Sequence, residues 1–465
     1  MKNFGFRTGC IVAALCAVFC LATTIAAQAQ TETPLGTVTG NPYGGALVQG
    51  TNGNFFGTTL YGGIYKLKYG NVFEVTPSGT LSNVYSFCRE AHVCPDGETP
   101  YGGLMVAANG SLYGTTSYGG ANSGGTVFEI SPGDKFSTLY NVPYLEASYA
   151  GLVQGFNGDL YGSAGDFIFS INSAGTETTI YTFCSLPNCA DGTGAGMLTL
   201  GANGDLYGIT GDGGAYKHGT FFKLTPAGVL ITLHNFTAVE GEGSNGLVLA
   251  SNGNFYGTSG FGGANNAGTV YELTPAGHIT ILHNFCSAAN CADGNRPSSA
   301  LIEGTDGNLY GTTPLGGTGG LGSCASYCGT AYQITTSGTL TTLYNFCSLP
   351  NCTDGLAPYY GLVQGTDGNF YGAGYDGTIF KLSTGLGPLV RSNPVFGRAG
   401  YSISILGSDL TGTTAVTFNG VAATFSVVSA TQIKATVPAG ATSGTIEVTT
   451  PGGVLSSNVA FQILP

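Results

Sequence analysis

Four aspartates could bind a cation or a polar ligand, because each stands in the motif Cys-x-Asp-Gly. These residues are Asp96, Asp191, Asp293 and Asp354. Calcium prefers several oxygen ligands close together, so four repeated acids could form a site for calcium or a cationic ligand. The alternative is that each aspartate caps its own turn. We favour capping, because equivalent positions on stacked sheets lie at least about 10 Å apart, too far for one ion. We predict no metal and no cofactor.

Three tyrosines, Tyr101, Tyr359 and Tyr360, follow these motifs closely. Tyrosine rings can stack on sugars, which would make these residues part of a binding surface. The alternative is that they pack in the core where neighbouring sheets meet. With the four aspartates, they complete the set of candidate binding residues.

Ten of the thirteen cysteines lie beyond residue 29 and form five close pairs. The pairs are Cys88 with Cys94, Cys184 with Cys189, Cys286 with Cys291, Cys324 with Cys328, and Cys347 with Cys352. We interpret them as five local disulfides, each worth about 2 kcal/mol by loop-closure entropy. Zinc is the alternative, but it usually needs paired CxxC-like spacings.

Catalytic groups do not form a linear motif in this sequence. The histidines are His92, His218, His234, His278 and His283, and two of them, His234 and His283, occupy a position that tyrosine fills in other copies of the repeat described below. We interpret these two as members of an aromatic row and not as bases. Carboxylates could still converge from separate parts of the chain, so a polysaccharide hydrolase or lyase remains an alternative to our expectation that the protein is not an enzyme.

The elements that would position these residues are repeated. The motif [Asn/Asp]-Gly-[Asn/Asp/Ser]-[Leu/Phe]-[Tyr/Phe]-Gly occurs seven times, at intervals of 46 to 61 residues, with first glycines Gly53, Gly110, Gly158, Gly204, Gly253, Gly307 and Gly368. This period suits a four-stranded propeller blade, and each copy contains four short strand-like runs separated by tight turns. We predict an all-β fold in which residues 30–386 form a seven-bladed β-propeller.

The last copy lacks a fourth strand, whereas residues 34–45 before the first copy resemble one. We therefore predict that an N-terminal strand completes the last blade and closes the ring. An open solenoid is the alternative, and it would leave unprotected sheet edges.

The N-terminus resembles a signal peptide. Residues 1–29 begin with Lys2 and Arg7, continue with an apolar run, and end in Ala27-Gln28-Ala29. A membrane anchor is the alternative for this segment, and we expect no membrane association after its removal. The remaining 25 acidic and 11 basic residues disfavour nucleic-acid binding. We predict a secreted or cell-surface protein, with a periplasmic location also open.

The repeat pattern resembles the GloVer tandem repeat of exported bacterial proteins over residues 34–386. Residues 387–465 are similar to an IPT/TIG domain, through Pro394, Gly397, Gly400 and the runs at 405–410, 416–423, 433–438 and 444–453. This resemblance implies an immunoglobulin-like β-sandwich, and the alternation of apolar and polar residues with turn glycines independently favours a sandwich.

The long, cysteine-containing connections should all lie on one side of the ring. In a blade of four antiparallel strands, the turns between strands 1 and 2 and between strands 3 and 4 share one side, and the remaining connections share the other. A rigid scaffold that presents variable loops is typical of binding proteins. We predict a surface that binds an extracellular polysaccharide or surface protein, with a structural role in a surface assembly as a further alternative.

Overall fold

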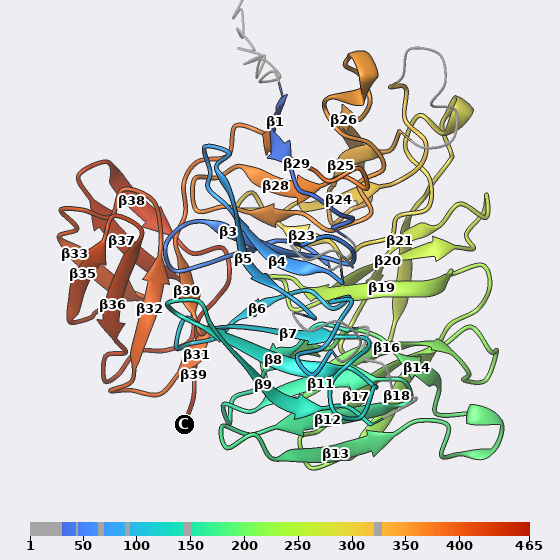
Figure 1. Cartoon of the computed structure of the whole chain (residues 1–465), viewed down its shortest axis with the longest axis horizontal. Coiled ribbons are helices and arrows are strands. Elements are labelled where there is room, and N and C mark those ends of the chain that lie inside the picture. The colour runs from blue at the N-terminus through green and yellow to red at the C-terminus, as the bar shows by residue number, and fades with distance from the viewer. Residues whose placement is uncertain (1–29, 43–44, 64–68, 89–93, 144–149, 320–327) are drawn as a thin grey trace, which may run out of the picture.

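The computed structural model describes residues 30–42, 45–63, 69–88, 94–143, 150–319 and 328–465. The expected signal peptide at residues 1–29 lies outside this part of the chain, as do His92 and Cys324. The described residues are almost entirely β-strands and turns, as predicted (Figure 1). None of their helices is long and apolar enough to cross a membrane.

The repeats form consecutive antiparallel sheets, six of which follow the chain in order. The first sheet contains β2 (Val48–Gln49), β3 (Phe55–Thr59), β4 (Asn71–Val75) and β5 (Leu81–Ser86). The second contains β6 (Met105–Val106), β7 (Leu112–Thr116), β8 (Thr126–Ser131) and β9 (Lys135–Asn141). The third contains β10 (Val153–Gln154), β11 (Leu160–Ala164), β12 (Phe167–Ile171) and β13 (Glu177–Thr182). The fourth sheet contains β15 (Thr199–Leu200), β16 (Leu206–Asp212), β17 (Thr220–Leu224) and β18 (Leu230–Asn235), and β14 (Thr193–Ala195) also pairs with β16. The fifth contains β19 (Glu242–Leu249), β20 (Phe255–Phe261), β21 (Thr269–Leu273) and β22 (Ile279–Asn284). The sixth contains β23 (Ile302–Glu303), β24 (Leu309–Thr313), β25 (Thr330–Ile334) and β26 (Leu340–Asn345).

The seventh sheet joins the two ends of the repeat region, as predicted from the missing strand. It has the order β1 (Thr31–Thr37), β29 (Thr378–Ser383), β28 (Phe370–Ala373) and β27 (Val363–Gln364). Strand β1 pairs antiparallel with β29 along its whole length. The N-terminal strand therefore takes the outermost place, which the fourth strand of a repeat occupies elsewhere.

Hydrophobic side chains close the ring. Each of the first six sheets shares a buried cluster with the next sheet along the chain. The last sheet shares a cluster with the first, in which the rings of Phe55 and Tyr371 stack with centroids 3.9 Å apart. The inner strands are buried on both faces, which explains why their sequences do not alternate cleanly between apolar and polar residues.

The tight turns depend on glycine. The first glycine of every motif copy has a positive φ, between 75° and 87°. L-residues with a Cβ rarely adopt this left-handed conformation, so the repeated Asn-Gly or Asp-Gly sequence follows directly from the hairpin geometry.

Residues 390–463 form the predicted immunoglobulin-like sandwich around one hydrophobic core. One sheet has the order β30 (Arg391–Asn393), β32 (Ser402–Leu406), β36 (Gln432–Thr436), β35 (Phe425–Ser429), and the other has the order β34 (Val421–Ala422), β33 (Ala415–Phe418), β37 (Ile446–Thr450), β38 (Gly453–Ser456). A further pair joins β31 (Phe396–Gly397) and β39 (Gln462–Ile463) in parallel.

The C-terminal domain packs against the side of the ring that bears the turns between first and second strands (Figure 1). Asn393 Nδ2 donates to the carbonyl oxygen of Ala107 over 2.8 Å, and Thr431 Oγ1 donates to that of Thr51 over 3.2 Å. The side of the propeller that bears these tight turns is thus partly covered by the C-terminal domain. The long connections lie on the opposite side.

Candidate binding face

The side of the ring opposite the C-terminal domain carries the long connections, and we call it the stapled face. Four of the predicted disulfides lie there, each in a return from the fourth strand of one sheet to the first strand of the next: Cys88–Cys94, Cys184–Cys189, Cys286–Cys291 and Cys347–Cys352. Three returns also contain a short 3-10 helix: η1 (Pro187–Cys189), η2 (Ala289–Cys291) and η3 (Pro350–Cys352). The fifth predicted pair includes Cys324, outside the described residues; Cys328 is buried, with Sγ 3.2 Å from the carbonyl oxygen of Gly319.

Each candidate aspartate is held by its own disulfide loop. Asp191 Oδ2 accepts hydrogen bonds from the Ser185 backbone N–H (3.0 Å), the Ser185 hydroxyl (2.8 Å) and the Tyr181 hydroxyl (2.9 Å). Its Oδ1 accepts from the Leu186 N–H over 3.3 Å. This arrangement matches the interpretation of an aspartate that caps its own loop.

The other three aspartates have matching contacts. Asp96 accepts from the Tyr85 hydroxyl and the Cys88 N–H, Asp293 from His283 Nε2 and the backbone of Ser287 and Ala288, and Asp354 from the Tyr344 hydroxyl and the backbone of Ser348 and Leu349. The structure therefore distributes the four carboxylates over four separate returns, where each stabilises its own loop.

These hydrogen bonds change the acidity of the carboxyl groups. Burial alone would raise the pKa of Asp191, but hydrogen bonds from Ser185, Tyr181 and Leu186 outweigh it and lower the pKa below its usual value. Burial opposes the shift at Asp293 in the same way, and the hydrogen bonds from Ser287, Ala288 and His283 lower its pKa. Both aspartates are thus stabilised as anions within their loops.

His283 takes the place that tyrosine fills in other repeats, as predicted for the aromatic row. His283 Nε2 lies 3.0 Å from Asp293 Oδ2, in the place where Tyr181 contacts Asp191. The His283 ring also packs edge-on against Phe285 with centroids 5.1 Å apart, as Tyr181 does against Phe183. His283 therefore substitutes for a structural tyrosine.

The return between β18 and β19 has no cysteine pair but keeps the same contacts. His234 Nε2 lies 3.2 Å from Glu240 Oε2, which also accepts from the Thr237 N–H and hydroxyl. Burial alone would raise the pKa of Glu240, but these contacts lower it. Glu240 was not predicted as the equivalent of the four aspartates, because it does not stand in a Cys-x-Asp-Gly motif.

The three candidate tyrosines have different environments. Tyr360 is buried, and its carbonyl oxygen accepts a hydrogen bond from Thr312 of the neighbouring sheet over 2.9 Å. Tyr101 is half-buried. Tyr359 is also half-buried, and its ring lies 5.7 Å from that of Tyr375. Tyr360 is thus a core residue, whereas Tyr359 adjoins an aromatic side chain at the surface.

Exposed aromatic side chains recur on the stapled face where the second strand of a sheet ends. Tyr61, Tyr118 and Phe261 lie eight residues after the first glycine of their motif copies, and Tyr375 lies seven residues after Gly368. Their exposed fractions are 58%, 48%, 45% and 45%. These residues were not among the candidates predicted from the sequence. Each stands before Gly-Gly or Asp-Gly, and the end of a buried strand would show the same pattern.

A polar cavity lies beside one of these aromatic residues. It has a volume of about 320 Å³, and its lining includes Asn265, Asn290, Asn295 and Arg296. The guanidinium carbon of Arg296 lies 4.6 Å from the centre of the Phe261 ring. Amide and guanidinium groups beside an aromatic ring can form hydrogen bonds and stacking contacts with the same ligand.

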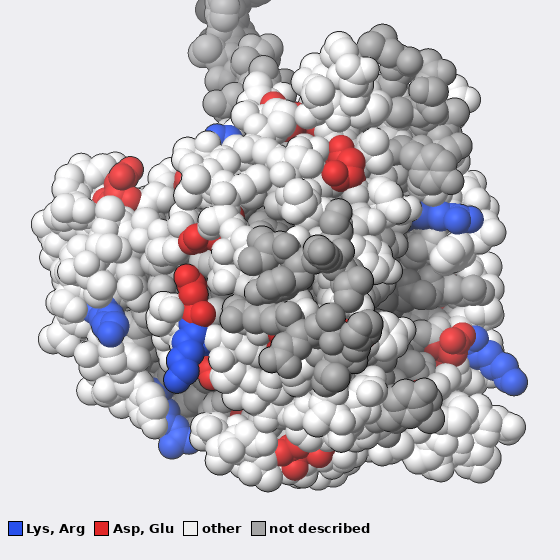
Figure 2. Space-filling model, viewed as in Figure 1, with Lys and Arg blue, Asp and Glu red and all other residues white. Residues whose placement is uncertain are grey.

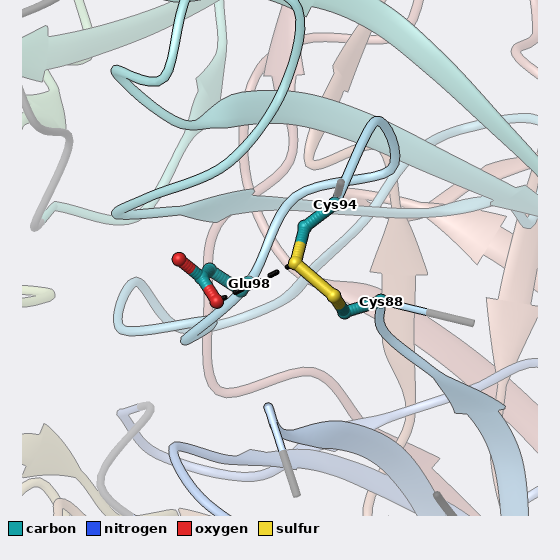
Figure 3. Close-up of side chains that lie close together, drawn as sticks. All are labelled: Cys88, Cys94 and Glu98. Atoms are coloured by element: carbon teal, nitrogen blue, oxygen red, sulfur yellow. Dashed lines mark hydrogen bonds between the residues drawn. A yellow bond between two sulfur atoms is a disulfide. The ribbon is translucent and has the colours of Figure 1, made fainter. Parts of the chain in front are cut away.

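Cys88, Cys94 and Glu98 form the one group among the described residues whose positions would suit a metal ion (Figure 3). Cys94 Sγ lies 3.5 Å from Glu98 Oε2, and burial raises the pKa of Glu98. However, the two sulfur atoms are joined in a disulfide, and metal binding by cysteine requires thiolates. The group therefore belongs to a loop that is closed by a disulfide.

The fold is that of a β-propeller followed by an immunoglobulin-like domain. A family model described as the Gloeobacter/Verrucomicrobia repeat matches residues 17–194 and 193–389, and the IPT/TIG domain model matches residues 390–463. The chain thus belongs to the Gloeobacter/Verrucomicrobia repeat family and carries a C-terminal IPT/TIG domain. The four disulfides among the described residues are typical of an exported protein. A comparison with curated proteins found no match.

Several solved structures share the fold. Virginiamycin B lyase from Staphylococcus aureus is similar over 76% of this chain and 98% of its own, with 16% identity and a TM-score of 0.52. A fungal alcohol oxidase in complex with copper is similar over 94% and 100%, with 12% identity and a TM-score of 0.52. The extracellular domain of a hybrid two-component system from B. thetaiotaomicron is similar over 93% and 54%, with 13% identity and a TM-score of 0.51. At these identities the similarity shows the fold alone.

Proposed function

We propose that this protein is a surface or secreted binding protein whose stapled face recognises an extracellular polysaccharide without chemical turnover. The observation that supports this most directly is the recurrence of exposed aromatic side chains where the second strand of a sheet ends, represented by Tyr118, Phe261 and Tyr375. Large exposed aromatic residues are costly to leave in water and are enriched in binding surfaces.

The chemistry of the face suits a neutral, hydroxyl-rich polymer. Only 8% of the residues are charged, so few charged groups are available to any face of the molecule. Figure 2, which has the same view as Figure 1 and sees the ring from its side, shows scattered acidic and basic residues among many uncharged ones. Aromatic rings offer flat apolar surfaces to sugar rings, while the asparagines of the nearby cavity, such as Asn265 and Asn290, can exchange hydrogen bonds with hydroxyl groups. Repetition around a ring would allow one long polymer to contact several sheets.

The absence of turnover is part of the proposal. The acids of the stapled face that sequence analysis selected are engaged by hydrogen bonds from their own loops, and Asp191 alone accepts four. A general acid or base must reach the substrate proton it transfers. Carboxylates held in this way stabilise the conformation of their own loops.

The test is co-sedimentation of residues 30–465 with insoluble polysaccharides, with measurement of released reducing ends in the same tubes. We expect saturable binding to at least one polysaccharide and no release. Replacement of Tyr118, Phe261 and Tyr375 together by alanine should weaken that binding by at least about tenfold, because aromatic anchors contribute strongly to interfaces.

The matched control is Tyr401→Ala, which removes an aromatic residue that is 61% exposed but lies in the C-terminal domain. This variant should bind like the wild type. Equal losses in both variants, or no binding to any polysaccharide, would contradict the proposal, and release of reducing ends would replace it with an enzymatic function.

A further inference from the structure

A second cavity lies on the other side of the molecule, where the C-terminal domain meets the propeller. Its volume is about 390 Å³, within the range of small-molecule sites. Its walls include the apolar side chains of Tyr207, Leu249 and Phe255 from the propeller, and Val459 and Ala460 from the C-terminal domain. Both domains are therefore needed to form it.

Glu303 is the one charged residue among the described residues that line this cavity, and it is only 8% exposed. Its carboxylate accepts hydrogen bonds from the Ser251 N–H (2.8 Å) and from the Ser251 hydroxyl (2.6 Å). Within the described part of the chain, no Lys, Arg or His forms a salt bridge with Glu303. A buried carboxylate without a cationic partner is costly.

Three other repeats show what a polar residue can do at this position. Three copies have glutamine here, and each donates from Nε2 to the carbonyl oxygen of the glycine in its own turn: Gln49 to Gly53 (3.0 Å), Gln154 to Gly158 (3.1 Å) and Gln364 to Gly368 (3.3 Å). A carboxylate cannot donate this bond. Glu303 therefore lacks the turn contact that the three glutamines make, and places a carboxylate at the cavity instead.

The C-terminal domain fixes this arrangement from the opposite side. Asn458 Nδ2 donates to the carbonyl oxygen of Glu303 over 3.1 Å, while Asn458 Oδ1 is buried and has no hydrogen-bond partner among the described residues. A hydrogen-bond acceptor thus accompanies the carboxylate among the residues that line the cavity. Both groups would be satisfied by a ligand that donates hydrogen bonds and carries positive charge.

We propose that this interdomain cavity binds a small organic amine, with the ammonium group at Glu303 and an apolar body against Leu249 and Phe255. The proposal does not depend on polysaccharide binding, because the cavity lies on the side of the ring that bears the turns between first and second strands and not on the stapled face. An ammonium group suits the carboxylate, and a hydrocarbon or aromatic body suits the walls.

The test is isothermal titration of residues 30–465 with benzylamine, and with benzyl alcohol as a neutral compound of nearly the same shape. Glu303→Gln restores the residue found in the three other copies, so we expect this variant to fold and to keep its melting temperature. Loss of the charged hydrogen bond should weaken benzylamine binding by about 10- to 100-fold. Benzyl alcohol should bind weakly and equally to both proteins.

A second variant, Ala460→Trp, tests the location. Ala460 is exposed on the C-terminal domain at the cavity, so a bulky side chain there should block the site without disturbing a core. We expect loss of benzylamine binding in this variant, with polysaccharide binding unchanged in both. Absence of saturable benzylamine binding to the wild type, or unchanged binding in either variant, would overturn the proposal.

Discussion

Glu32 provides the sharpest test of how the ring is closed. It lies in β1, opposite Leu382 of β29, and both of its carboxylate oxygens are buried with no hydrogen-bond partner in the part of the chain that the structure describes. Four other sheets have an aliphatic residue at the equivalent register: Leu81, Leu230, Ile279 and Leu340. Burial, and secondarily the negative charge of Asp354, raise the pKa of Glu32 from 4.5 to about 8.

The sign of the effect on stability follows from proton binding. In the folded chain the carboxyl group keeps its proton up to about pH 8, whereas in the unfolded chain it releases the proton above pH 4.5. The free energy of unfolding must therefore fall as the pH rises from 4.5 to 8. Each tenfold change in proton affinity is worth about 1.4 kcal/mol, which sets an upper limit of about 5 kcal/mol. Because part of the side chain remains exposed, solvent screening reduces this to about 2 kcal/mol.

Glu32→Gln and Glu32→Leu remove this titration. At pH 9 we expect each variant to be more stable than the wild type by about 2 kcal/mol, or about 2 °C in melting temperature for a chain of this length. At pH 4, where the wild-type carboxyl group is protonated in both states, the Glu32→Gln difference should vanish. Calorimetry and urea unfolding at both pH values measure this. A constant difference from pH 4 to pH 9, or a loss of stability at pH 9, would refute the assignment of Glu32 to a buried, unpaired site.

Two further predictions concern the loops and the ring. Asp191→Ala should destabilise the protein by about 1–3 kcal/mol at pH 7, because the loop donors lose their acceptor. Since the pKa of Asp191 is lowered in the folded state, its contribution should begin to be lost as the pH falls below about 4. The difference in melting temperature between variant and wild type should therefore narrow as the pH is lowered further, and a difference that stays constant would contradict the capping role. Removal of residues 30–38 should expose the edge of β29 and produce a lower melting temperature and self-association in light scattering, whereas a monomer of unchanged stability would show that β1 does not close the ring.

The architecture could largely be predicted from the sequence because its determinants are local. The period of 46 to 61 residues and the turn glycines specify four-stranded units, and the missing fourth strand of the last copy implied that the chain's start would supply it. The disulfide pairs could be predicted for the same reason, since partners such as Cys184 and Cys189 are five residues apart.

The candidate sites were harder to predict, because they depend on exposure and on contacts between distant segments. Tyr118 and Phe261 follow the same sequence pattern that a buried strand end would show, and only the folded chain shows that they are exposed. The motif Cys-x-Asp-Gly marked the four aspartates as one recurrent feature, but only the loop geometry shows which atoms contact them. Glu303 and Asn458 are 155 residues apart and meet only because the C-terminal domain docks on the ring.

The sequence by itself thus determined the repeated sheet, its turns, its local disulfides and the strand that joins its ends, because each rests on short-range backbone geometry or on a repeat count. The tertiary structure decided which side of the ring the C-terminal domain covers, which aromatic side chains face solvent, and which carboxylate is left without a cationic partner. Those properties arise from the packing of segments far apart in the chain, and no local pattern contains them.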